Sequence, residues 1–316
     1  DRFQLHDILD SRPKFIYKLI EMVRAAKMTT KGFREFEPFV EGHYNSIDSN
    51  GFEAKDLEYH AGILYILVHT KFRNKKFKES QLFNDKLESL IDEMPKALRK
   101  RFFLKMSLVK AANYAYTGDP KQAISVIDHL IDSSEYSKNL QAVSVALLNK
   151  SIYCLFLGNT KEANNIHVTF PYTDKQIEKV LGKEWTLKKS LIFIIYQFDM
   201  ENYELVISLV RNFQRNFDQL LKKDIYKRVK SFAYTIRDLA ANPENLGNAD
   251  VWNQIDEQFE TMAFEDEDLQ AMTFYSWLRA KFNGLNFYES LMQHISHAGD
   301  QSQYLPVMRK DQVQKS

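Results

Sequence analysis

The chain has 316 residues, of which 44% are hydrophobic and 13% aromatic, so it can bury a large core. Lys and Arg total 43 and Asp and Glu total 42, a balance that counts against a dedicated nucleic-acid binder, whose phosphate contacts require a basic excess. The single cysteine, Cys154, excludes internal disulfides and multi-thiolate metal sites and is expected to be a buried, inert thiol. No apolar run approaches the roughly 18 residues that span a bilayer, and no basic-then-apolar signal segment is seen, so we expect a soluble, cytoplasmic protein.

Seven breaks divide the chain into pairs of predicted helices. They are centred at Gly32, Lys75, Gly118, Gly158, Glu201, Pro243 and Gly284, at intervals of 40 to 43 residues. In chain order, apolar residues at helical spacing predict helices over 13–27 and 33–44, 59–72 and 76–93, 101–116 and 121–131, 140–157 and 161–167, 186–198 and 203–221, 225–241 and 251–259, and 269–283 and 287–295. Pro171 interrupts the fourth pair, which a further helix over 174–181 completes. A fixed period of this size indicates a repeat architecture.

The two helices of a pair differ in how many of their faces are apolar. Over 59–72 apolar residues lie on more than one face, as expected of an inner helix that is packed on both sides. Over 76–93 they form one stripe, as expected of an outer helix with one face in water. No window alternates like a strand. We therefore predict a single all-α repeat domain over residues 1–297, followed by a polar, flexible tail over 298–316.

An aromatic residue, a Gly-Asp turn and a small residue recur around the breaks. They are Tyr114, Gly118, Asp119 and Ala123 in one pair and Gly158 and Ala163 in the next, with partial matches at Phe77 and Ser80 and at Tyr203, Val206 and Ile207. This pattern resembles the tetratricopeptide repeat, although that family repeats every 34 residues or so and its Trp-x-x-Leu-Gly opening is absent here. HEAT and armadillo arrays have a period closer to the one seen. The resemblance implies a right-handed α-α superhelix of about seven helical hairpins, whose inner helices line a concave groove that binds a peptide or a helix.

Members of that family that bind acidic C-termini carry Lys and Asn at fixed inner-helix positions. The resemblance places those positions at Tyr65 and His69, Leu108 and Ala112, Leu148 and Ile152, and Leu191 and Ile195. Because none of these positions holds Lys or Asn, no preference for acidic peptide C-termini is predicted.

Inner-helix positions that face the expected groove carry aromatic and basic residues, types that are enriched at interface hot spots. They are Tyr65, His69, Phe72, Arg73, Lys105, Tyr116, Lys188, Phe198, Arg237 and Lys281. We expect the aromatic side chains to supply affinity, and Arg73, Lys105 and Arg237 to orient the partner. Core packing is an equal alternative for Phe72 and Phe198.

Sequence motifs for catalysis are missing from the chain. It has no Gly-rich phosphate loop, no His-Glu-x-x-His, no Gly-x-Ser-x-Gly and no Cys-x-x-Cys. His294 and His297 are three residues apart, but two histidines without a third ligand do not predict a metal site. We therefore expect no enzyme activity, no cofactor and no metal.

Charge is segregated along the chain. Residues 71–105 hold 11 Lys and Arg against 5 Asp and Glu, a second basic run covers 222–230, and residues 244–270 hold 9 acids and no base. In an elongated array, separation in sequence becomes separation in space. Self-association through oppositely charged ends is one interpretation of this pattern, and solvated outer faces are the other.

Three functions remain open at this stage. The first is a non-catalytic scaffold that binds a protein or peptide segment in its concave groove. The second is a nucleic-acid-binding helical repeat that uses the basic runs at 71–105 and 222–230, against which the near-neutral charge and the acidic last third count. The third is an enzyme on an α-helical scaffold, which would need acids or histidines that converge in one pocket.

Overall fold

The computed structural model describes residues 30–48, 57–134, 136–259 and 269–299, with the side chains of 30, 31, 46–48 and 297–299 left aside. Over these residues the chain is all-α and contains no strand. The helices are α2 (Thr30–Asp48), α3 (Leu57–Arg73), α4 (Phe77–Asp92), α5 (Lys96–Tyr116), α6 (Pro120–Asp132), α7 (Leu140–Phe156), α8 (Thr160–Val168), α9 (Asp174–Leu181), α10 (Lys183–Asp199), α11 (Tyr203–Leu221), α12 (Lys227–Ala241), α13 (Ala249–Phe259), α14 (Leu269–Asn283) and α15 (Phe287–Gly299), with short 3-10 helices η2 (Asp224–Tyr226) and η3 (Pro243–Asn245).

The predicted helices are confirmed wherever the structure describes them. α9 and α14 have the predicted bounds, whereas α5 begins at Lys96, five residues before its predicted start. The break predicted at Gly32 is wrong, because Gly32 lies in the first turn of α2, where few intrahelical hydrogen bonds depend on it. The predicted helix over 13–27 and residues 300–316 of the predicted tail lie outside the described residues.

Five of the breaks form one recurring turn. The backbone angle φ is positive at Lys75, Gly118, Gly158, Glu201 and Gly284. At each, the next residue donates its N–H to the carbonyl five residues earlier, as Asp119 does to Tyr114 at 2.9 Å. This Schellman ending requires a left-handed residue, which explains why glycine recurs there.

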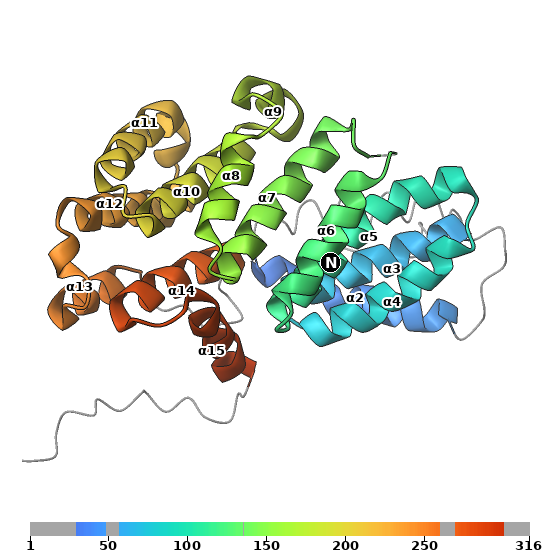
Figure 1. Ribbon diagram of the computed structural model, residues 1–316. Helices are drawn as coiled ribbons and strands as arrows, with labels where there is room; N and C mark the ends of the chain where they lie inside the picture. Colours follow the sequence, from blue (N-terminus) through green and yellow to red (C-terminus); the bar gives the residue numbers. More distant parts are fainter. Residues whose placement is uncertain (1–29, 49–56, 135, 260–268, 300–316) are drawn as a thin grey trace, which may run out of the picture.

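Alternate helices of the chain pack against one another as well as against their neighbours in sequence. α3 contacts α5, α5 contacts α7, α7 contacts α10, and α10 contacts α12, so these five helices form a continuous layer (Figure 1). In two predicted pairs the helix of this layer has more buried side chains than the helix that follows it: ten in α7 against two in α8, Ala163 and Ile166, and ten in α10 against six in α11. The predicted difference between inner and outer helices is therefore present in these two pairs.

The last hairpin returns to the middle of the molecule. In Figure 1, the red helices α14 and α15 lie near the lower ends of α6 and α7. Tyr288 of α15 donates its hydroxyl to the carbonyl of Ala115, the penultimate residue of α5, at 2.6 Å. Phe287 packs on Phe156 of α7, with ring centroids 5.3 Å apart. The premise that distance along the chain becomes distance in space thus fails for this hairpin.

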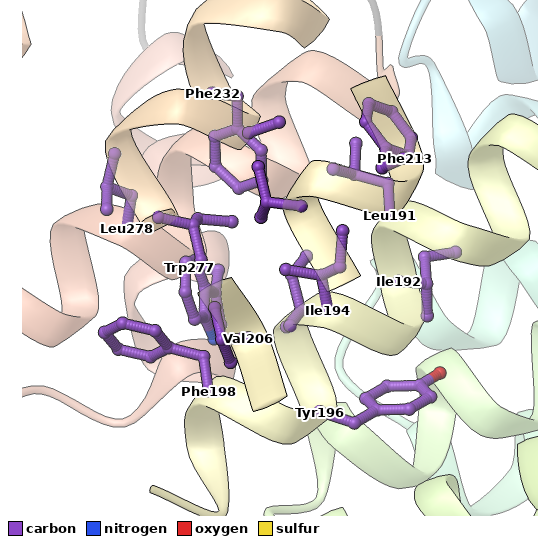
Figure 2. Close-up of a cluster of buried hydrophobic side chains, with 14 of the residues drawn as sticks. Leu191, Ile192, Ile194, Tyr196, Phe198, Val206, Phe213, Phe232, Trp277 and Leu278 are labelled. Carbon is purple, nitrogen blue, oxygen red and sulfur yellow. The ribbon is translucent and has the colours of Figure 1, made fainter. Parts of the chain in front are cut away.

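Trp277 anchors α14 to the layer. Its fully buried ring lies between Phe198 of α10 and Phe232 of α12, at centroid distances of 5.5 and 5.9 Å (Figure 2). The indole Nε1 donates to Asp199 at 3.0 Å, and Lys281 pairs with the same carboxylate at 2.5 Å. Burial raises the pKa of Asp199, while Lys281 and Trp277 counteract the rise. Apolar packing and a partly buried ion pair therefore act together to hold α14.

A buried lysine ties α2, α3 and α4 together. Lys71 is 1% exposed, and its ammonium group lies 2.7 to 3.0 Å from the carboxylates of Glu37, Glu41 and Glu79. Burial alone would raise the pKa of Glu37, but hydrogen bonds from Lys71, Lys76 and Asn74 outweigh it and hold the pKa below 4.5. This part of the basic run at 71–105 is structural.

Candidate functional site

A cavity of about 310 Å³ lies between the layer and the returning helix α14. We call it the central cavity. It is lined by His69, Phe72 and Arg73 of α3, Leu108, Val109, Ala112 and Tyr116 of α5, Asn149, Ile152, Tyr153 and Leu155 of α7, Lys188, Ile192 and Ile195 of α10, Leu269, Gln270, Thr273, Phe274 and Trp277 of α14, and Phe287 of α15. Six helices therefore contribute to one site.

Helical spacing explains why these side chains converge. Residues three or four apart share a helix face, so Leu108, Ala112 and Tyr116 point from α5 to the same side. The same spacing joins His69 to Phe72 on α3, and Lys188 to Ile192 and Ile195 on α10. Because α3, α5, α7 and α10 pack side by side, their faces combine into one wall.

The opposite wall comes from the C-terminal hairpin. The Tyr116 hydroxyl lies 2.9 Å from Thr273 Oγ1, which also donates to the carbonyl of Leu269 at 2.7 Å. The Tyr116 ring stacks on Phe77 with centroids 5.2 Å apart, which fixes its direction. Tyr116 is thus both a lining residue and a link between α5 and α14.

Five of the ten predicted groove residues line the central cavity: His69, Phe72, Arg73, Tyr116 and Lys188. They come from three helices that are separated by as many as 119 positions in the sequence. Positions that the tetratricopeptide resemblance assigned to the inner face, such as Leu108, Ala112 and Ile152, also line it.

Two more of the predicted residues adjoin the cavity. Tyr65 lies one helical turn before His69, with ring centroids 6.2 Å apart. Lys105, one turn before Leu108, places its ammonium group 5.3 Å from the centre of the Tyr65 ring. Burial raises the pKa of Tyr65 to about 12, so its phenol is neutral at physiological pH.

The remaining three predicted residues do not line the cavity. Phe198 is 2% exposed and packs in the core against Tyr203 and Trp277. Lys281 holds Asp199, as described above. Arg237 pairs with Asp238 at 2.7 Å and lies over the ring of Tyr234. Helix periodicity placed these residues near a face, but it did not show which neighbouring helix covers that face.

Sequence reasoning missed the contribution of α14. Residues 269–283 were expected to continue the inner row, whereas Leu269, Gln270, Thr273, Phe274 and Trp277 form a wall of the cavity. The one signal in the sequence is that this helix is apolar on several sides, which is compatible with either placement.

Members of the basic runs are paired with acids of the same chain. Arg99 pairs with Asp92 at 2.9 Å, and Lys222 pairs with Asp218 at 2.6 Å. Together with the buried Lys71, these pairs reduce the positive charge that the runs present to a ligand.

The described residues contain no group of three His, Cys, Asp or Glu side chains arranged to hold a metal ion. His294 Nδ1 lies 3.3 Å from the Ser276 hydroxyl, and the side chain of His297 is outside the described part. Cys154 is buried as predicted, and burial raises the pKa of its thiol to about 11, which is typical of an unreactive cysteine. Among the described helices, none combines the length and apolar character needed to cross a bilayer.

Comparison with known proteins gives no assignment. No family model matches the chain, and no curated protein or solved structure matches it either. The resemblance to tetratricopeptide repeats therefore rests on the residues quoted above.

Proposed function

We propose that this protein is a non-catalytic, tetratricopeptide-like helical repeat that binds a segment of a partner protein. The recurring Schellman turn and the layer of alternate helices support a right-handed α-α superhelix of hairpins. In such arrays each hairpin contacts mainly its neighbours, and the inner helices present an extended binding surface.

The position of α14 carries this proposal. α14 lies against the side of the layer on which the groove residues were expected, and it makes apolar and polar contacts with α5 and α10. This side of the layer is therefore suited to receiving a helix, and the part that α14 leaves uncovered offers the same kind of surface to another protein.

The uncovered part lies at the end of the central cavity formed by α3 and α5. We call Tyr65, Lys105 and Leu108 the partner face. Tyr65 and Leu108 are partly buried and apolar in character, and Lys105 is exposed beside them. A tyrosine with a neighbouring cation is a common hot-spot arrangement. The surface fits an amphipathic segment that places an acidic residue beside apolar ones.

Affinity capture with the immobilised protein tests the proposal. The captured partner is identified by mass spectrometry, purified and titrated against variants whose helical circular dichroism matches that of the wild type. Tyr65→Ala should weaken binding about 30-fold or more, as expected for a hot spot. Lys105→Glu should weaken it and Lys121→Glu, on the exposed side of α6, should not. A partner whose affinity is unchanged in Tyr65→Ala and in Lys105→Glu would refute the proposed face.

A further inference from the structure

The central cavity is large for a space inside a folded protein. Protein interiors hold few voids wider than a water molecule, whereas this cavity measures 310 Å³, at the lower end of the range for small-molecule sites. An apolar cavity of about 150 Å³ holds one benzene molecule, so about twice that volume fits a molecule of two fused rings. Phe72, Leu108 and Ile152 are partly exposed, so such a molecule can reach the cavity from solvent.

Three partly exposed aromatic rings form apolar walls of the cavity. They come from three helices: Phe72 from α3, Phe274 from α14 and Phe287 from α15. Each packs on a buried ring of the core, and these rings are, in the same order, Phe77, Phe232 and Phe156, at centroid distances of 5.5, 5.2 and 5.3 Å. The walls are therefore fixed before a ligand arrives, as in most small-molecule sites. Aromatic walls favour a ligand that itself contains rings.

The cations of the lining already have interaction partners. Among the described residues that line the cavity, the charged side chains are Arg73 and Lys188, and no carboxylate is among them. The Arg73 guanidinium lies 5.4 Å from the centre of the Phe33 ring, and both cations make further interactions. An ion that entered the cavity would lose its hydration without gaining an unoccupied partner of opposite charge, which is costly. The cavity therefore favours a neutral ligand.

Two neutral polar groups of α7 remain for a ligand. Tyr153 lines the cavity and is 4% exposed, yet its hydroxyl has no hydrogen-bond partner among the described residues. Asn149 lies one helical turn before it on the same helix face, and its amide is unpaired within the same residues. Burial raises the pKa of Tyr153, so its phenol stays protonated and can both donate and accept. The other uncharged polar side chains of the lining have partners: His69, Tyr116, Gln270, Thr273 and Trp277.

We propose that the central cavity binds a small neutral molecule of about two fused rings that carries one hydroxyl or carbonyl group. Its rings lie between Phe72, Phe274 and Phe287, and its polar group forms hydrogen bonds with Tyr153 and Asn149. The bound molecule contacts α3, α7 and the C-terminal hairpin together, so it stabilises the folded protein. The partner face is tested through residues that do not line the cavity, so either proposal can fail without the other.

Three probes share one apolar body and differ in charge: 2-naphthaleneethanol, 2-naphthylacetate and 2-(2-naphthyl)ethylamine. Isothermal titration calorimetry of the full chain should show the neutral alcohol binding about tenfold more tightly than either ion, because only the ions lose a charged hydration shell in the cavity. The proposal is overturned if the alcohol shows no saturable binding at millimolar concentration, or if either ion binds as tightly as the alcohol.

Substitutions of the two polar groups test the hydrogen bonds to the ligand. Tyr153→Phe deletes only the unpaired hydroxyl, and Asn149→Leu replaces the amide by an apolar group of similar size. Each should weaken binding of the alcohol about fivefold, the effect of one hydrogen bond. Tyr196→Phe is the matched control, because its buried hydroxyl bonds to Ser151 and does not line the cavity, and it should leave the affinity unchanged. Unchanged affinity in both Tyr153→Phe and Asn149→Leu would overturn the proposal.

NMR of the isoleucine δ1 methyl groups locates the probe without any substitution. The alcohol should shift the signals of Ile152, Ile192 and Ile195, which line the cavity, more than that of Ile63, which lies in the core around α3. Ala112→Phe fills the cavity from α5 and should abolish these shifts. Shifts centred on isoleucines outside the cavity, or shifts that survive in an Ala112→Phe variant with wild-type helical circular dichroism, would place the probe elsewhere and overturn the proposal.

Discussion

His167 provides a quantitative test of how burial sets the pH dependence of folding. Its ring stacks on Phe193 with centroids 4.1 Å apart and planes 5° apart. Burial, together with the nearby charge of Lys189, lowers the pKa of His167 from 6.5 to about 3. The folded protein thus excludes a proton that the unfolded chain binds below pH 6.5.

The sign and size of the effect follow from this difference in pKa. A histidine with a lowered folded pKa contributes stability that is present above the unfolded value and is lost as the pH falls toward the folded value. One unit of pKa difference is worth about 1.4 kcal/mol. Lowering the pH from 7 to 5 should therefore reduce the free energy of unfolding by about 2 kcal/mol through His167 alone.

His167→Phe keeps an aromatic ring beside Phe193 and removes the titration. We expect its free energy of unfolding, measured by urea titration with circular dichroism, to fall between pH 7 and pH 5 by about 2 kcal/mol less than that of the wild type. Ile166→Val is the matched control, because it removes one methylene from the adjacent buried side chain and leaves His167 in place. It should lower stability by about 1 kcal/mol equally at both pH values.

The reasoning is refuted if wild type and His167→Phe lose the same free energy of unfolding between pH 7 and pH 5. An independent check is the NMR titration of the His167 ring protons. These signals should show no inflection between pH 7 and pH 5, and a midpoint near pH 6 would contradict a partly buried ring that stays neutral.

Three further predictions concern the turns, the buried lysine and the C-terminal hairpin. Glu201→Gly removes the steric cost of the left-handed backbone conformation at this position and should raise the free energy of unfolding, measured by urea titration, by about 1 kcal/mol. An unchanged free energy of unfolding would contradict this prediction. Glu37→Gln breaks a buried ion pair with Lys71 and should lower that free energy by about 3 kcal/mol, near the lower limit for such pairs because other carboxylates still contact Lys71. The stability that the Glu37 carboxylate contributes should also be lost as the pH falls below 4.5 and through its lowered pKa. If the free energy of unfolding of Glu37→Gln fell with pH as steeply as that of the wild type over this range, this reasoning would be wrong. Tyr288→Phe removes the hydrogen bond to Ala115 and should lower the free energy of unfolding by about 1 kcal/mol. Amide hydrogen exchange should then be accelerated more in α14 and α15 than in α3. Uniform acceleration would show that the C-terminal hairpin does not unfold separately from the rest of the protein.

Local signals in the sequence were sufficient to predict individual helices. Thr173 and Gln176 form a capping box at the start of α9, and Gly182, with φ of 85°, ends it, so both bounds were predictable. Glycine at the breaks was informative for a similar reason, because a left-handed residue is needed there. Lys75 and Glu201 show that the turn also forms without glycine.

The candidate site was only partly predictable. Periodicity placed His69, Phe72 and Tyr116 on helix faces that do line the cavity. The same rule also selected Phe198, which α14 buries through Trp277. The spacing of apolar residues shows which side chains share a helix face, but it does not show which other helix covers that face.

The sequence by itself determined the all-α class, the helices and the recurring turns, because these depend on hydrogen bonds and spacing within a few residues. The tertiary structure alone decided that α14 returns to the layer and closes the central cavity. That return depends on contacts such as Tyr116 with Thr273, 157 residues apart, and on the sum of small rotations at every intervening turn. No local pattern encodes that sum, so the cavity became visible only once the helices were packed.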